Sequence, residues 1–158
     1  MECLGSFALP DYQMLFNEDS SDGSAKANIE FVKGKKAWGR VYGMSAEQKL
    51  ILDGYEGLGE SYRLDWFPVG SDCELKVFAY LALKTSDDCI SYHWYLYHVL
   101  RGAREGGFSK AVLDKIQSAR FQIDPDSERS KKELSIYSEK EQALVQSGQF
   151  NISLESLQ

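Results

Sequence analysis

The spacing of apolar residues changes near residue 92, and this change constrains the fold more than any other feature of the chain. Upstream, five segments have the alternation or composition of strands, near residues 12–16, 27–32, 37–42, 62–69 and 75–83. Downstream, helical spacing up to Gly106 predicts one buried face, formed by Tyr92, Tyr95, Leu96, Val99, Leu100 and Ala103. The pattern predicts an α+β fold in which the five strands form one mostly antiparallel sheet and the helix packs against it.

Short polar motifs predict where these elements begin and end. The segment 33–36, which reads Lys-Gly-Lys-Lys, predicts a solvated hairpin turn between the second and third strands. The polar residues 17–23 predict an exposed loop. The capping box of Ser45 and Gln48 predicts the start of a short helix, and Gly54 stands where a left-handed cap would end it.

The last third of the chain predicts one more packed helix and then a polar tail. Ser109 is expected to cap the helix, whose buried stripe is Val112, Leu113 and Ile116. The turn at residues 124–126 is expected to end a compact domain of residues 1–126. Residues 127–158 then form a tail that we expect to pack loosely, with one helix beginning at a capping box at residues 138–141 and stopping at 148.

Composition excludes several classes of function. With 158 residues and a net charge of -6, the chain has scattered Lys and Arg instead of the concentrated basic face that nucleic acid requires. No apolar run approaches the roughly 20 residues that span a bilayer, and the N-terminus lacks the pattern of a signal peptide, so we expect a cytoplasmic protein that binds no membrane. Three widely spaced cysteines, Cys3, Cys73 and Cys89, predict reduced thiols and no metal site.

One carboxylate remains after the usual catalytic patterns are considered. His93 and His98 are five residues apart, so they do not face one ligand on a helix, and no Ser lies in a G-x-S-x-G elbow. Glu56 lies between Tyr55 and Gly57 in a glycine-rich turn. Desolvation there would raise its pKa and suit it to proton transfer. On spacing alone, an ordinary surface glutamate in a turn is the other interpretation.

Several motifs between residues 9 and 123 resemble the gamma-glutamylcyclotransferase family. The segment 52–57, Leu-Asp-Gly-Tyr-Glu-Gly, is similar to the family's L-D-x-x-E-G. Residues 9–17, 27–29 and 37–42 resemble its second to fourth strands, and Tyr95 with the Gly-Ala-Arg-Glu-Gly-Gly of residues 102–107 resembles its later helix. The resemblance implies that Glu56 is catalytic and that Tyr62, Tyr95 and Gly57 line the substrate site. For both tyrosines, simple packing in the core is the alternative.

The resemblance also implies a fold and a reaction. The fold is a small, mostly antiparallel barrel-like sheet with flanking helices. The reaction converts a gamma-glutamyl group to 5-oxoproline and releases the attached amine or amino acid, so the expected partner is a small gamma-glutamyl substrate. Because attack is intramolecular and one carboxylate serves as base and acid, the reaction requires no cofactor and no metal.

One part of the family pattern has no counterpart in this sequence. The family begins with a strand and loop reading Y-G-S-N, whose amides are expected to hold the substrate, whereas Gly5-Ser6 leads directly into the second-strand pattern. Either the sequence is a truncated reading of a longer gene, or the protein has lost this element. Two functions therefore stay open: a gamma-glutamylcyclotransferase, or a non-catalytic binding or regulatory module on the same fold. The missing strand would leave a sheet edge unpaired, so we expect the chain to form a homo-oligomer through that edge or to pair a substitute segment along it.

Overall fold

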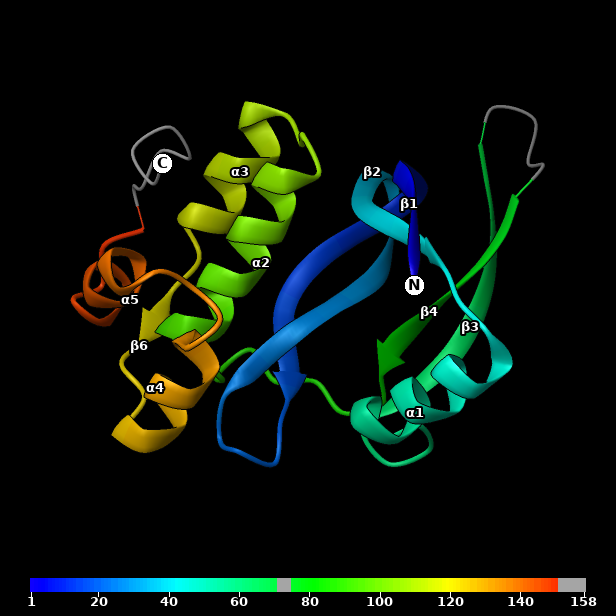
Figure 1. The fold of residues 1–158 in the computed structure, drawn as a ribbon. Helices are drawn as coiled ribbons and strands as arrows, with labels where there is room; N and C mark the ends of the chain where they lie inside the picture. The colour runs from blue at the N-terminus through cyan, green and yellow to red at the C-terminus, as the bar shows by residue number, and fades with distance from the viewer. Residues whose placement is uncertain (71–74, 151–158) are drawn as a thin grey trace.

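The computed structural model describes residues 1–70 and 75–150 of the chain. Its first part is one long antiparallel hairpin, with strands β1 (Glu2–Asp19) and β2 (Ala25–Gly43) (Figure 1). The turn between them, residues 20–24, is closed by bonds from Ser20 N–H to the Ser24 carbonyl (3.1 Å) and from Gly23 N–H to the Ser20 carbonyl (3.0 Å). The predicted exposed loop at residues 17–23 is therefore too long, because Asn17 and Glu18 belong to β1 and are buried.

The hairpin turn that the sequence predicts at residues 33–36 is wrong. The strand β2 continues through this segment, and its pairing with β1 jumps from Lys36 opposite Pro10 to Phe31 opposite Tyr12. The residues between them bulge out of the ladder, where Gly34 has φ +82° and donates its N–H to Asp11 Oδ1 at 2.7 Å. Gly34 and the lysines beside it therefore form a bulge within one long strand, and they do not form a turn between two strands.

A second hairpin confirms the predicted strands near residues 62–69 and 75–83. Its strands β3 (Tyr62–Val69) and β4 (Leu75–Ala82) pair antiparallel, from Tyr62 opposite Ala82 to Val69 opposite Leu75. The prediction of a single sheet is wrong, because the ladders of the described residues form three separate two-stranded sheets and no closed barrel. Asn28 joins the hairpins, since its Oδ1 accepts the Ala82 N–H at 2.9 Å.

The helix α1 (Ala46–Glu56) connects the two hairpins. The predicted capping box is confirmed: Ser45 Oγ accepts the Gln48 N–H, and the Gln48 side chain accepts the Ser45 N–H. The predicted stop at Gly54 is wrong, because the helix continues through Glu56 and Gly57 takes the left-handed cap position.

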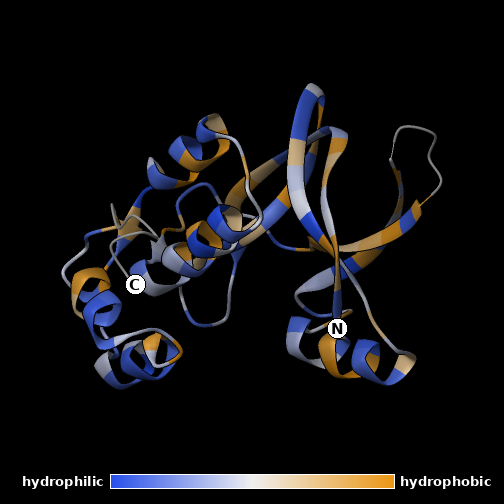
Figure 2. Cartoon of the chain, turned by 45° about the horizontal axis from the view of Figure 1, so that its top comes forward, coloured by the Kyte–Doolittle hydropathy of each residue, from blue (hydrophilic) through white to orange (hydrophobic). Residues whose placement is uncertain are grey.

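The helices after residue 92 form the core of the molecule. The helix α2 (His93–Glu105) has Leu96, Tyr97 and Leu100 fully buried. Around it lie α3 (Lys110–Gln117), α4 (Ser127–Leu134) and α5 (Glu139–Gln146), and a short parallel pairing joins β5 (Ser91–Tyr92) to β6 (Phe121–Gln122). Figure 2 shows apolar and polar bands interleaved along these helices, as expected when one side of each is buried.

The expectation that the residues after 126 pack loosely is wrong for the described part of that segment. Leu134 on α4 and Val145 on α5 are fully buried, and Phe150 also packs in the core. The predicted capping box at residues 138–141 is confirmed at the start of α5. Among the described residues, none of the helices has both the length and the apolar character required to cross a membrane.

Candidate active site at the end of α1

The segment that resembles L-D-x-x-E-G forms the last turn of α1 and its cap. Gly57 has φ +62°, a conformation that favours glycine, and its N–H points back to the carbonyls of Asp53 and Gly54. The Gly57 carbonyl then accepts N–H groups of the following turn, including that of Ser61 at 2.9 Å. Gly57 therefore reverses the chain directly after Glu56, and this is the role that the structure gives to it.

The aspartate of the same motif attaches α1 to the second hairpin. Tyr80 on β4 donates its hydroxyl to Asp53 Oδ1 at 2.5 Å, and Lys49 Nζ lies 2.8 Å from both carboxylate oxygens. The hydrogen bond from Lys49, followed by the one from Tyr80, lowers the pKa of Asp53. Asp53 thus remains a charged anchor, which leaves Glu56 as the carboxylate of the motif suited to proton exchange.

Glu56 is the last residue of α1 and is partly buried. Burial raises the pKa of its carboxyl above the ordinary 4.5 of a glutamate. A carboxyl shifted toward neutral pH exchanges its proton more readily under physiological conditions than an exposed one. The partial burial and raised pKa of Glu56 fit a desolvated carboxyl better than an ordinary surface glutamate.

Two predicted site tyrosines form hydrogen bonds with the backbone of one residue, Ala27. Tyr62, at the start of β3, donates its hydroxyl to the Ala27 carbonyl at 3.2 Å, and the Tyr95 hydroxyl on α2 accepts the Ala27 N–H at 2.9 Å. Three elements that are distant in sequence, β2, β3 and α2, are joined at this point. These hydrogen bonds give both tyrosines a structural role, and their place in a substrate site remains a prediction.

The negative charge of Glu56 acts on both tyrosine hydroxyls. Burial is the largest cause of the raised pKa of Tyr95, which reaches about 12, and the negative charge of Glu56 raises it further. Burial, followed by Tyr95, Glu18 and Glu56, also raises the pKa of Tyr62. Both phenols are therefore neutral at physiological pH, so Tyr62 and Tyr95 keep their hydroxyl hydrogens beside Glu56.

Sequence reasoning missed a second carboxylate near this cluster. Glu18, near the end of β1, is only 2% exposed, and its Oε2 has no hydrogen-bond partner among the described residues. Burial raises its pKa, which Lys26 lowers and nearby acidic groups, among them Asp22 and Glu56, raise. Its polar surroundings at residues 17–23 concealed it, because such a stretch is typical of exposed loops.

The other residues that we considered for chemistry have structural contacts elsewhere. His93 Nδ1 accepts the Asp124 N–H at 3.2 Å and its Nε2 lies 3.1 Å from Ser130 Oγ, so both ring nitrogens are engaged in the core. His98 Nδ1 lies 2.6 Å from the Tyr137 hydroxyl. Cys3 and Cys89 are free thiols, and Cys73 lies outside the described residues.

Comparison with known proteins gives structural relatives only. No family model matches the sequence, and no curated protein matches it. A solved gamma-glutamyl cyclotransferase is similar in structure, with a TM-score of 0.69, 17% sequence identity and coverage of 93% of this chain and 86% of that one. An uncharacterized human protein is similar with a TM-score of 0.66 and 19% identity, over 83% of this chain and 85% of that one.

A third structure, YkqA from Bacillus subtilis, is similar with a TM-score of 0.63 and 20% identity, over 77% of this chain and 47% of that one. At identities this low, such similarity establishes a fold and not an activity. The similarity extends over most of the present chain, which includes the motif around Glu56 that resembles L-D-x-x-E-G. The chain therefore has the gamma-glutamyl cyclotransferase-like fold.

Proposed function

We propose that this protein is a cytoplasmic gamma-glutamylcyclotransferase that converts a gamma-glutamyl group to 5-oxoproline and that Glu56 transfers the proton. The observation that carries the proposal is the partly buried carboxyl of Glu56 at the capped end of α1, where burial raises its pKa. The charge of Glu56 also contributes to the raised pKa of Tyr62 and Tyr95. The shared fold with a solved gamma-glutamyl cyclotransferase supports it.

The reaction requires one proton to move between two nitrogen atoms. The substrate's α-amino nitrogen attacks its own γ-carbonyl carbon, a new C–N bond closes a five-membered ring, and the original amide C–N bond breaks. Ionised Glu56 takes a proton from the attacking nitrogen and returns it to the departing nitrogen. Because the nucleophile and the carbonyl belong to one molecule, correct positioning supplies much of the remaining rate enhancement.

The tyrosines fit a positioning role in this proposal. Tyr95 uses an oxygen lone pair to accept the Ala27 N–H and retains its own hydrogen for donation. Tyr62 donates to the Ala27 carbonyl and so sets the direction of its ring. Gly57 contributes the left-handed cap that ends α1 directly after Glu56, and the family resemblance is what suggests that substrate approaches there.

The decisive experiment measures 5-oxoproline release from a gamma-glutamyl dipeptide. Glu56→Gln keeps the size of the side chain and removes the basic carboxylate, so we expect kcat to fall by about 10²- to 10⁴-fold. Glu60→Gln is the matched control, because it makes the same chemical change at an exposed position four residues away. Circular dichroism of both variants separates catalysis from folding.

The pH profile adds a second measurement. Glu56 must be ionised to accept the proton, so kcat/KM should fall as the pH drops through a pKa that burial has raised above 4.5. Turnover by Glu56→Gln at the parent rate would refute the assignment. If the parent chain binds the dipeptide without releasing 5-oxoproline, the binding-module interpretation is correct instead.

A further inference from the structure

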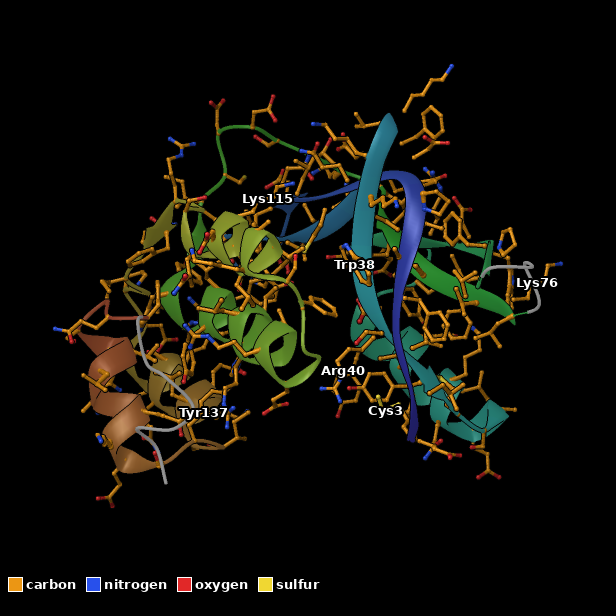
Figure 3. The ribbon with its side chains drawn as sticks, turned by 90° about the horizontal axis from the view of Figure 1, so that it is seen from above. Cys3, Trp38, Arg40, Lys76, Lys115 and Tyr137 are labelled. Atoms are coloured by element: carbon orange, nitrogen blue, oxygen red, sulfur yellow. The ribbon has the colours of Figure 1, made fainter. Side chains whose placement is uncertain are left out.

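A cavity of about 370 Å³ lies between β2 and the helices α2 and α3, separate from the Glu56 cluster. Its walls come from residues 36–42 of β2, from the C-terminal half of α2 and from α3. Figure 3 views the molecule with Lys115 of α3 on one side and Trp38 and Arg40 of β2 on the other. Cavities of about this size are typical of small-molecule sites.

Most of the cavity wall is apolar. Buried Ala37, Ala103 and Ile116 are among its lining residues. Trp38, which is 41% exposed, and Phe108 form an aromatic pair with ring centroids 6.1 Å apart. An apolar chain that entered would cover exposed aromatic and aliphatic surface, which favours binding.

All three charged residues that line the cavity are cations. They are Lys36, Arg40 and Lys115, and none of the described residues that line it is acidic, although the whole chain has a net charge of -6. Burial lowers the pKa of Lys115, and the positive charge of Lys35 lowers it further. The Lys115 end of the cavity is thus a local concentration of positive charge that a bound anion would stabilise.

The cations differ in how much of their bonding capacity is already used. Arg40 is engaged by Glu105, with Nη1 and Oε2 3.5 Å apart, and by Cys3 Sγ at 3.5 Å. Lys115 Nζ donates to the Met14 carbonyl at 3.0 Å, and an ammonium group has three hydrogens to donate. An anionic group is therefore better received by Lys115 and Lys36 than by Arg40, which already contacts Glu105 and Cys3.

We propose that this cavity binds a small amphipathic carboxylate, with its head group between Lys36 and Lys115 and its aliphatic chain along Trp38 and Phe108. The inference goes beyond the proposed cyclisation and does not depend on it. The ligand class follows from the cation-only charge of an otherwise apolar cavity.

Titration calorimetry with sodium decanoate, in its monomeric concentration range, tests the ligand class. Decanol and decylamine have the same chain without the negative charge, so both should bind at least about tenfold more weakly. From hexanoate to decanoate the affinity should rise by up to about fourfold for each added methylene that is buried. Equal binding of decanol, or no dependence on chain length, would overturn the proposal.

Variants test the site itself. Lys36→Gln combined with Lys115→Gln should weaken decanoate at least about fivefold and leave decanol unchanged. Lys132→Gln, on exposed surface of α4, removes a charge away from the cavity and should have no effect. Ala111→Trp places a large side chain at an exposed lining position of α3 and should block binding without disturbing the core.

Amide chemical shifts locate the ligand. Decanoate should shift residues of α3 such as Val112 and leave Val77 and Phe78 of β4 unchanged, because these two line the neighbouring groove between the hairpins. Shifts centred on β4, or unaltered affinity in the double lysine variant, would contradict the proposed site. Glu56→Gln should bind decanoate like the parent, so a failure of the proposed cyclisation is distinguishable from a failure here.

Discussion

The helical part of this molecule, α2–α5, and its strand part, which consists of β1–β4 and the connecting helix α1, bury apolar residues very differently. On α2, Leu96, Tyr97 and Leu100 are completely buried, whereas α1 has no buried residue and leaves Leu50 72% exposed and Tyr55 86% exposed. Because buried apolar surface is the main favourable contribution to folding, most of the stability should reside in α2–α5. The part that holds the candidate active site should contribute much less.

The strand part also differs in how its elements are supported. Each hairpin is a two-stranded ladder, and an isolated hairpin is only marginally stable in water. Hydrogen bonds from side chains connect the hairpins to each other and to α2, notably between Asn28 and Ala82 and between Tyr95 and Ala27. A few polar contacts thus position the candidate site, while apolar packing among α2–α5 supports the fold. The following predictions test that division.

We expect the largest change in stability at a buried carboxylate of the helical part. The Asp124 carboxylate accepts hydrogen bonds from Arg129 Nε and Nη2, at 2.7 and 2.6 Å, and from Trp94 Nε1, at 2.7 Å. Asp124→Ala leaves these donors unpaired and should lower the free energy of unfolding by about 3–5 kcal/mol in urea denaturation. Asp114→Ala, at an exposed ion pair with Lys110, should cost less than about 1 kcal/mol and serves as control.

Acid should weaken the same contact. Burial opposes ionisation of Asp124, but bonds from Arg129 and Trp94 outweigh it and lower its pKa from 3.8 to about 2. A lowered carboxyl pKa stabilises the fold above the unfolded value, so this contribution, about 2 kcal/mol, should be lost as the pH falls from about 4 to 2. An Asp124→Ala variant whose stability had the same pH dependence as the parent would exclude this cause.

Truncating a core side chain from the C-terminal segment should have the next largest effect. Leu134 on α4 is fully buried, so Leu134→Ala should lower the free energy of unfolding by about 2–5 kcal/mol. The matched change Leu50→Ala on α1 should stay within about 0.5 kcal/mol, because that side chain is largely exposed. Similar losses in the two variants would show that the two parts of the molecule do not differ as proposed.

Removing either site hydroxyl should have a smaller effect. Tyr95→Phe leaves the Ala27 N–H without its acceptor and should cost about 1–3 kcal/mol, whereas Tyr62→Phe removes a donor from a carbonyl and should cost about 0.5–1.5 kcal/mol. Tyr55→Phe, at an exposed position, controls for the chemical change. Under the proposed function both site variants should lose less cyclisation activity than Glu56→Gln, and an equal or greater loss would give the tyrosines a direct catalytic role.

The smallest change in stability should accompany a change in association. Trp66 on β3 is 54% exposed, and β3 forms a ladder with β4 alone among the described residues. We propose that the chain self-associates along such an edge, as exposed strands do. Trp66→Lys should shift light scattering toward the monomer while changing the free energy of unfolding by less than about 1 kcal/mol. A parent protein that remains monomeric at high concentration would contradict the proposal.

Local sequence signals predicted much of the fold because they act within a few residues. The strands near residues 62–69 and 75–83 and the capping boxes at Ser45 and Ser138 are confirmed. The predicted buried face of α2 is confirmed only in part. Tyr95 and Val99 of that face are only partly buried. Trp94 and Tyr97, which lie outside it, are buried. A helix surrounded on several sides has no single apolar face, so periodicity underestimates its burial.

The candidate site was predicted as a set of residues but not as a geometry. The motif around Glu56 predicted the carboxylate, and the family resemblance selected Tyr62 and Tyr95. Both tyrosines bond to the backbone of Ala27. A backbone partner leaves no signal in the sequence, so the meeting point could not be predicted. Glu18 was missed for a related reason: a glutamate in a polar stretch gives no local signal that strands will cover it.

The sequence by itself determined the order and type of most elements, the caps of α1 and α5, and Glu56 as the carboxylate to test. Tertiary structure alone decided that β2 passes through its lysine-rich segment as a bulge, that two hairpins stay separate, and that Leu134 and Val145 complete the core. The physical reason is that the interactions involved act over different distances along the chain. Caps and periodicities depend on neighbours within one or two turns, whereas burial, desolvation and contacts between distant elements depend on the whole folded chain.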